Sequence, residues 1–315
     1  MKFSEKGLRI GFSLILLAFL FWYAQPLEAF AQLIRVAPLM IGISATGFGI
    51  IILLNALNGW WLLNGLVPIP FLKMLRYYLY SWVAEFYFPG KLGAFSIAYF
   101  LKKENVTVGQ STAIVMLTKL STVTLAFGLG IAGLATWGWV GGLEHYLMIA
   151  GILIIVTFWT FFTKRGRDVV KRIILRHHTG LFIGFGGLVQ RLGRNPLRLL
   201  VFIGLVGSGL LTQALVAHLL IGQAGFYIPL EVMVSIVSLV LLIGMVPLSF
   251  NGLGLREGLF VVLLEGFGVP GDIALAVGAL NSGVGIALSF ILTLLLLSRI
   301  PIPKWRDIVN ENSTS

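Results

Sequence analysis

Apolar runs of about 20 residues recur along this 315-residue chain, and this feature limits what the chain can fold into. An α-helix needs about that length to cross the hydrocarbon core of a bilayer, which is about 30 Å thick. Charged residues make up 11% of the chain, against about 25% in soluble domains. The sequence therefore predicts an all-α, polytopic integral membrane protein. Its residues 1–315 should form a single membrane domain, with too little chain left over for a large soluble domain.

Six of the apolar segments are predicted to cross the membrane fully. The first also resembles a signal peptide, because basic residues precede it and Ala29-Phe30-Ala31 follows it. We favour an uncleaved helix, since Arg35 and Pro38 lead into the next segment as in a short external loop. The predicted crossings are Ile10–Ala24, Leu39–Leu66, Thr107–Thr136, His145–Phe162, Leu197–Ile221 and Ile273–Leu297.

The positions of the basic residues predict the orientation of the chain. A formal net charge of +11 can indicate a nucleic-acid partner, but here the basic residues cluster in short loops between apolar runs, as the positive-inside rule expects. With both termini in the cytoplasm, all but four of the 23 lysines and arginines lie on the inner side, the four being Arg35, Lys91, Lys119 and Arg256. We therefore expect a multi-pass plasma-membrane protein with cytoplasmic termini that binds no nucleic acid.

Two further apolar segments are interrupted near their middle by glycine and proline. They are Tyr77–Leu101, broken at 88–93, and Leu230–Gly268, broken at 247–258. Lys73 and Arg76 precede the first segment in a predicted inner loop, and Lys102 and Lys103 follow it on the same side. We therefore expect the segment to enter the membrane and return as a re-entrant hairpin. The second should do the same from the other side. The alternative is two kinked spans and eight or more crossings.

This arrangement predicts an inverted repeat with halves 39–136 and 197–297, joined through a basic stretch at 164–198. Paired broken segments in two oppositely oriented halves indicate a transport site near the midplane of the membrane. The basic stretch is either a plain cytoplasmic loop or a segment that lies on the inner leaflet and attracts anionic headgroups.

Ionisable residues inside the predicted membrane region are the first candidates for function, because burying a charge there is costly. Arg256 suits a phosphate, since its planar guanidinium can donate two parallel hydrogen bonds and stays charged. Lys119 lies in the middle of the third crossing and either contacts a ligand or forms a structural ion pair with Glu85 or Glu257. Glu257 could instead orient Arg256 or pair with a cationic headgroup.

The sequence contains no recognisable catalytic constellation. There is no cysteine, the four histidines form no metal-spaced motif, and no P-loop, nucleophile elbow or zinc-binding pattern is present. We therefore expect no cofactor, no metal and no enzymatic activity.

A known family shares the two broken segments. The stretch Pro247-Leu248-Ser249-Phe250-Asn251-Gly252-Leu253-Gly254-Leu255-Arg256-Glu257-Gly258 resembles the Pro-x-Ser-x-x-Gly-x-Gly-x-Arg-Glu motif of the lysylphosphatidylglycerol synthase transmembrane, or flippase-like, family. The stretch Glu85-Phe86-Tyr87-Phe88-Pro89-Gly90-Lys91-Leu92-Gly93 resembles that family's first motif. The resemblance covers nearly the whole chain and implies a standalone membrane domain that handles a lipid or lipid-linked substrate.

The chain also departs from that family's pattern in its first half. Glu85 stands where the family often has Asn, Ala94 stands where it has an acidic residue, and Thr118-Lys119 stands where it favours Glu-Arg. We therefore expect the first half to hold a headgroup in its own way. No segment resembles the soluble synthase domain, so the resemblance does not imply aminoacyl transfer.

Two functions compete at this point. The first is a lipid-translocating or lipid-binding transporter for an anionic phospholipid or lipid-linked substrate. The second is a membrane enzyme, or an accessory subunit, of lipid or glycan assembly. An oligomer or a synthase partner fits either one. The candidate substrate-binding residues are Glu85, Pro89, Gly90, Lys91, Gly93, Lys119, Asn251, Gly252, Gly254, Arg256 and Glu257.

Overall fold

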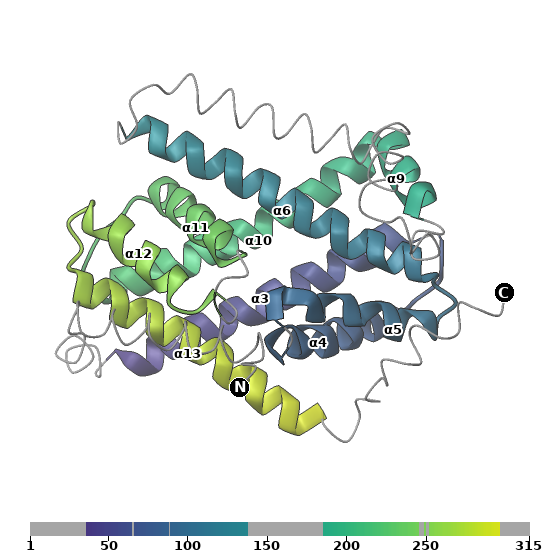
Figure 1. Ribbon diagram of the computed structural model, residues 1–315, viewed down its shortest axis with the longest axis horizontal. Helices are drawn as coiled ribbons and strands as arrows, with labels where there is room; N and C mark the ends of the chain where they lie inside the picture. The colour runs from purple at the N-terminus through teal and green to yellow at the C-terminus, as the bar shows by residue number, and fades with distance from the viewer. Residues whose placement is uncertain are drawn as a thin grey trace, which may run out of the picture.

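The computed structural model describes residues 36–64, 66–87, 89–137, 185–245, 249 and 252–296. Within these ranges every regular element is a helix (Figure 1). The predicted first and fourth crossings, at 10–24 and 145–162, lie outside the described residues, as do both termini and residues 164–184 of the basic stretch. The total of six crossings and the location of the termini therefore stay predictions.

Four of the described helices are long and apolar enough to cross a membrane. They are α3 (Ala37–Leu63), α6 (Val108–Thr136), α10 (Pro196–Gln223) and α13 (Gly271–Leu296). At about 1.5 Å per residue, each is roughly 40 Å long, which exceeds the hydrocarbon thickness. Their bounds lie within three residues of the predicted second, third, fifth and sixth crossings. The all-helical, multi-pass prediction is confirmed.

Local sequence explains where two of these helices begin. Pro196 occupies the first turn of α10, and the Asn195 side chain accepts the backbone N–H of Arg198 at 3.1 Å. Ahead of α6, Thr107 and Gln110 exchange hydrogen bonds between side chain and backbone, at 3.1 and 3.2 Å. Both arrangements satisfy N–H groups that a helix start leaves without an intrahelical acceptor.

The first broken segment folds back on itself. It consists of α4 (Phe71–Tyr87), the 3₁₀ helix η1 (Pro89–Ser96) and α5 (Ile97–Lys102). The Ser81 hydroxyl donates toward the carbonyls of Gly93 and Ala94, at 3.4 and 3.0 Å. Nearer the open end, the rings of Tyr77 and Phe100 stack with their centroids 5.7 Å apart. These pairings make the two arms antiparallel.

Glu104 closes the open end of this first hairpin. It accepts hydrogen bonds from Lys73 at 2.7 Å and from the Tyr77 hydroxyl at 2.6 Å. The hydrogen bond from Lys73, followed by that from Tyr77, lowers the pKa of the Glu104 carboxyl. One prediction was wrong here: the helix begins at Phe71 rather than Tyr77. Lys73 and Arg76 therefore lie in its first turns and not in a loop.

The second broken segment consists of α11 (Leu230–Gly244) and α12 (Leu255–Glu265). With 15 and 11 residues, these helices are roughly 22 and 16 Å long, too short to cross the hydrocarbon core singly. Gly252 and Gly254 have φ of 78° and 84°, a region that favours glycine, and they turn the chain into α12. A Cβ added to Gly252 would lie 2.9 Å from the Gly244 Cα, so the turn packs directly on the end of α11.

Two hydrophobic cores occupy opposite ends of the long helices. One joins α4, α5 and the start of α6 to the C-terminal end of α3 and the N-terminal end of α10. The other joins α11, α12 and the start of α13 to the opposite ends of α3 and α10. Each broken segment also packs against a spanning helix of the other predicted half, α11 against α6 and α4 against α13. In Figure 1, α3 and α10 run through the middle of this assembly.

A short amphipathic helix, α9 (Phe185–Arg194), lies within the predicted basic stretch and was missed at the sequence level. Leu188, Val189 and Leu192 are buried in the core that contains α4 and α6, whereas Arg194 is exposed. This end of the stretch is therefore an anchored helix and not a plain loop.

A substitution at Gly93 tests whether η1 packs directly on the backbone of α4 in the first hairpin. A Cβ at this position would overlap the backbone of Ala84 and Glu85, and helix backbone cannot move as a side chain can. Gly93→Ala should lower the free energy of unfolding by about 1–3 kcal/mol, measured by thermal unfolding in detergent. Gly128→Ala on α6 is the matched control, since nothing lies within 4 Å of its added Cβ. Equal stability of the two variants would contradict the hairpin.

Candidate functional site

A cavity of about 230 Å³ lies between the two broken segments. Its wall is built from α3, α4, α6, α10 and α11, and Arg256 of α12 completes it. The sequence-predicted residues that line it are Glu85, Lys119 and Arg256. We call this space the central cavity. Residues from both predicted repeat halves therefore face one space, as a shared transport site requires.

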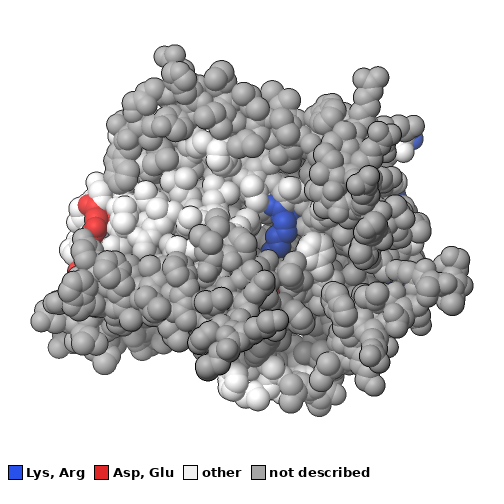
Figure 2. Space-filling model, in the orientation of Figure 1, with Lys and Arg blue, Asp and Glu red and all other residues white. Residues whose placement is uncertain are grey.

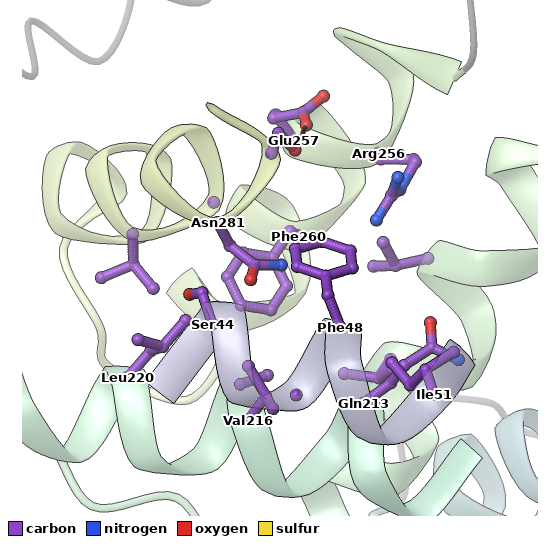
Figure 3. Close-up of a pocket in the computed structure, with 17 residues that line it drawn as sticks. Ser44, Phe48, Ile51, Gln213, Val216, Leu220, Arg256, Glu257, Phe260 and Asn281 are labelled. Carbon is purple, nitrogen blue, oxygen red and sulfur yellow. Dashed lines mark hydrogen bonds between the residues drawn. The ribbon is translucent and has the colours of Figure 1, made fainter. Parts of the chain in front are cut away.

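Smaller pockets open beside the central cavity, one on each hairpin. The Arg256 pocket, of about 90 Å³, lies between α3, α10, α11, α12 and α13 and shares Arg256, Phe48 and Gln213 with the central cavity (Figure 3). The Glu85 pocket, of about 70 Å³, lies against α4 and shares Glu85 and Lys119 with it. The charged residues thus stand at the boundaries between the central cavity and its side pockets.

Lys119 and Glu85 form an ion pair across this boundary. The Lys119 Nζ lies 2.5 Å from the Glu85 Oε1, joining α6 to α4. The side chains are 38% and 19% exposed, so both reach the cavity. Of the alternatives open at the sequence level, Glu85 and not Glu257 is the partner of Lys119. The charges of this pair cancel.

Arg256 is held in place by two glycines. Its aliphatic stem passes so close to Gly244 and Gly252 that a Cβ would lie 2.7 Å from the Arg256 Cδ at the first and 2.9 Å at the second. Larger residues at these positions would displace the stem. Figure 3 shows the guanidinium extending from the start of α12 toward the space between the helices. Within the part of the chain that the structure describes, no ion pair or hydrogen bond neutralises it.

Glu257 forms its hydrogen bonds with Gly254 and Ser282 and not with Arg256 or Lys119. Its carboxylate accepts the backbone N–H of Gly254 at 2.7 Å and the hydroxyl of Ser282 on α13 at 2.5 Å. The side chain is 3% exposed and lies at the N-terminus of α12, where the helix dipole favours a negative charge. Glu257 therefore fixes the start of α12 against α13. In Figure 3 it extends in a different direction from Arg256.

The remaining candidate residues fall into two groups: three glycines whose backbone packs closely, and four residues of which the structure describes no side chain. Gly93 packs against α4, and Gly252 and Gly254 form the turn before α12, so all three have structural roles. Pro89, Gly90 and Lys91 belong to η1, but their side chains are not among those described, and Asn251 also lies outside the described residues. Whether any of these seven residues contacts a ligand stays a prediction.

Neutral polar residues complete the wall, and sequence reasoning centred on charges missed them. Asn55, Asn58, Thr118, Thr122 and Gln213 all line the central cavity. Asn58 donates a 3.4 Å hydrogen bond to the Thr118 hydroxyl and so links α3 to α6. Their helical spacing within apolar crossings, three residues apart on α3 and four apart on α6, was the signal that could have revealed them.

Figure 2 shows a basic patch near the middle of the face shown, and uncharged residues border it in part. Apolar helices long enough to span a membrane, arranged around an interior cavity lined by charged and polar side chains, define the class: a multi-pass helical membrane protein.

Comparison with known families agrees with this class. The model of the lysylphosphatidylglycerol synthase TM region matches residues 8–293, and the chain belongs to that family. The family connects the protein with lipid handling in the membrane. Comparisons with curated proteins and with solved structures gave no match.

The ion pair at the central cavity is tested by a double-mutant cycle. Lys119→Met and Glu85→Gln should each destabilise the protein, because each leaves a charged partner without its counter-ion. The double variant should be more stable than the sum of the two effects predicts, with a coupling of about 1 kcal/mol in thermal or denaturant unfolding. Strictly additive effects would show that the two side chains do not interact in the folded protein.

Proposed function

We propose that this protein binds the anionic headgroup of a phospholipid or lipid-linked substrate in the central cavity and passes the lipid between leaflets. The observation that carries the proposal is that Arg256 has no counter-ion among the described residues. Of the four described charged groups at the cavity and its pockets, Glu85 neutralises Lys119, and Glu257 is bound by Gly254 and Ser282. Glu257 does not line the central cavity, so among the described residues that do, the positive charge of Arg256 is left without a counter-ion.

The chemistry of guanidinium favours a phosphate as its partner. Arg256 stays protonated even when partly desolvated, and its planar fork matches two phosphate oxygens. A charge without a partner costs much free energy at membrane depth, so the site favours an anion that supplies the missing counter-charge. A phosphodiester, which carries one negative charge, balances the three charged groups that line the central cavity.

The architecture supports movement of the lipid as well as binding. Three features fit two re-entrant hairpins related as an inverted repeat. They are the antiparallel first hairpin, the short helices α11 and α12, and the packing of each broken segment against the other predicted half. In such folds, rocking of one repeat against the other exposes a fixed central site to each side in turn. Exposed apolar residues such as Leu53, Leu215 and Leu294 give the outer surface the character that acyl chains require.

The proposal is tested with a fluorescent phosphatidylglycerol in proteoliposomes, whose outer-leaflet label is bleached by dithionite. Arg256→Met should reduce the translocation rate by about tenfold or more, because a charge-assisted bidentate contact is lost. Arg256→Lys should retain part of the rate, since it keeps the charge and loses the fork. Arg194→Met, which changes an exposed arginine on α9, should translocate like the wild type.

Thermal stability separates a binding role from a structural one. If Arg256 binds a headgroup, Arg256→Met should unfold near the wild-type temperature in detergent, whereas added phosphatidylglycerol should raise the unfolding temperature of the wild type more than that of the variant. Equal lipid-dependent stabilisation of both proteins, or equal translocation rates, would overturn the proposal.

A further inference from the structure

The Arg256 pocket contains buried polar atoms that have no partner among the described residues. Ser44 of α3 is 0% exposed, and its hydroxyl has no hydrogen-bond partner among the described residues. The Oδ1 of Asn281 on α13 is also buried and lacks a partner within the same residues. Both line the pocket, and Figure 3 shows them extending into it from opposite sides. Buried polar atoms are nearly always paired, so these two mark a place for a hydrogen-bonding ligand.

The unpaired atoms specify what that ligand must offer. The Asn281 Oδ1 is an acceptor and needs a donor, whereas the Ser44 hydroxyl can donate or accept. Ser282, which also lines the pocket, gives its proton to Glu257 and keeps lone pairs free to accept. A hydroxyl group meets all of these needs, because it donates and accepts through one atom.

The same pocket is poorly suited to a cationic group. Its described lining contains one carboxylate, Glu257, and one guanidinium, Arg256, so the pocket has no net negative charge to hold a cation. An ammonium group would also lie beside the Arg256 guanidinium, which lines the same space, and would be repelled by it. The pocket therefore favours a neutral group next to the anion.

The volume of the Arg256 pocket limits the size of the group that it can hold. The pocket holds about 90 Å³, and a bound water needs roughly 10–15 Å³ on the same measure. It therefore accommodates a small group of several heavy atoms and not a large oligosaccharide or a peptide.

We propose that the Arg256 pocket recognises a small, uncharged, hydroxyl-bearing headgroup through Ser44 and Asn281, while Arg256 holds the phosphate to which that headgroup is attached. The substrate class is thus an anionic phosphodiester lipid with a polyol headgroup. This inference rests on the proposed function, and it adds a selectivity that Arg256 alone does not provide.

Two lipids of equal charge test the inference. Phosphatidylglycerol and phosphatidylmethanol are both phosphodiesters with one negative charge, but only the first has hydroxyl groups on its headgroup. Binding of each is measured by lipid-dependent thermal shift and by competition against the fluorescent lipid. The wild type should bind phosphatidylglycerol about tenfold more tightly, the effect of about one additional hydrogen bond.

Variants of the lining residues test whether the preference for phosphatidylglycerol over phosphatidylmethanol arises in the Arg256 pocket. Asn281→Leu keeps the size of the side chain and removes the amide, so it should bring both lipids to the affinity of phosphatidylmethanol. Ser44→Ala, a smaller change, should weaken the preference in the same direction and covers the case in which Asn281→Leu does not fold. Gln190→Leu on α9, an exposed amide far along the chain from the pocket, should keep the full preference.

The outcomes distinguish this inference from the function on which it rests. Equal wild-type affinity for the two lipids, with both weakened by Arg256→Met, would overturn hydroxyl recognition and leave anion binding intact; the pocket would then hold only water. Affinity that is unaffected by Arg256→Met for either lipid would overturn the proposed function itself. A preference that survives in both Ser44→Ala and Asn281→Leu would place headgroup recognition elsewhere and refute the inference.

Discussion

Backbone that is not helical has no water to bond with inside a bilayer, and this constraint shapes the whole molecule. Each break in the apolar segments must be satisfied by the protein or by a watery cavity. In the first hairpin, the Ser81 hydroxyl and the close approach of Gly93 to α4 meet this need. In the second, Glu257 accepts the N–H of Gly254 where the chain turns into α12. The breaks are therefore packed on both sides of one central cavity.

That packing explains how Arg256 is held at the cavity although no described residue supplies its counter-ion. Gly244 and Gly252 leave a channel only wide enough for the aliphatic stem of Arg256, which directs the guanidinium to the boundary of the central cavity and its side pocket. The first predicted half contributes a neutralised pair to the same cavity, Lys119 on α6 with Glu85 on α4. The two halves thus contribute unequal chemistry to a shared space: a neutralised pair from the first and the positive group of Arg256 from the second.

The sequence was informative about the fold wherever a single physical property decided it. Run length and hydrophobicity placed α3, α6, α10 and α13 to within three residues, because a spanning helix depends mainly on those properties. The position of α4 was less predictable, since Lys73 and Arg76 read as loop residues until Glu104 was found to pair with Lys73. The helix α9 was also missed, because a short amphipathic segment among many arginines is stabilised by tertiary burial of Leu188 and Leu192.

The site was predictable from the sequence only in part. Arg256, Glu85 and Lys119 stood out because charge is rare in apolar runs, and all three line the central cavity. Which carboxylate pairs with which cation depends on three-dimensional packing, and Ser44 and Asn281 are ordinary polar residues until their neighbours are known.

The central claim, a phosphate held by Arg256, is tested most directly by solid-state NMR of the protein labelled with ¹⁵N-arginine in phosphatidylglycerol bilayers. The account predicts a strong ³¹P–¹⁵N dipolar contact that disappears in Arg256→Lys and persists in Arg194→Lys. A spectrum in which the Arg256→Lys variant retains every contact of the wild type would contradict it.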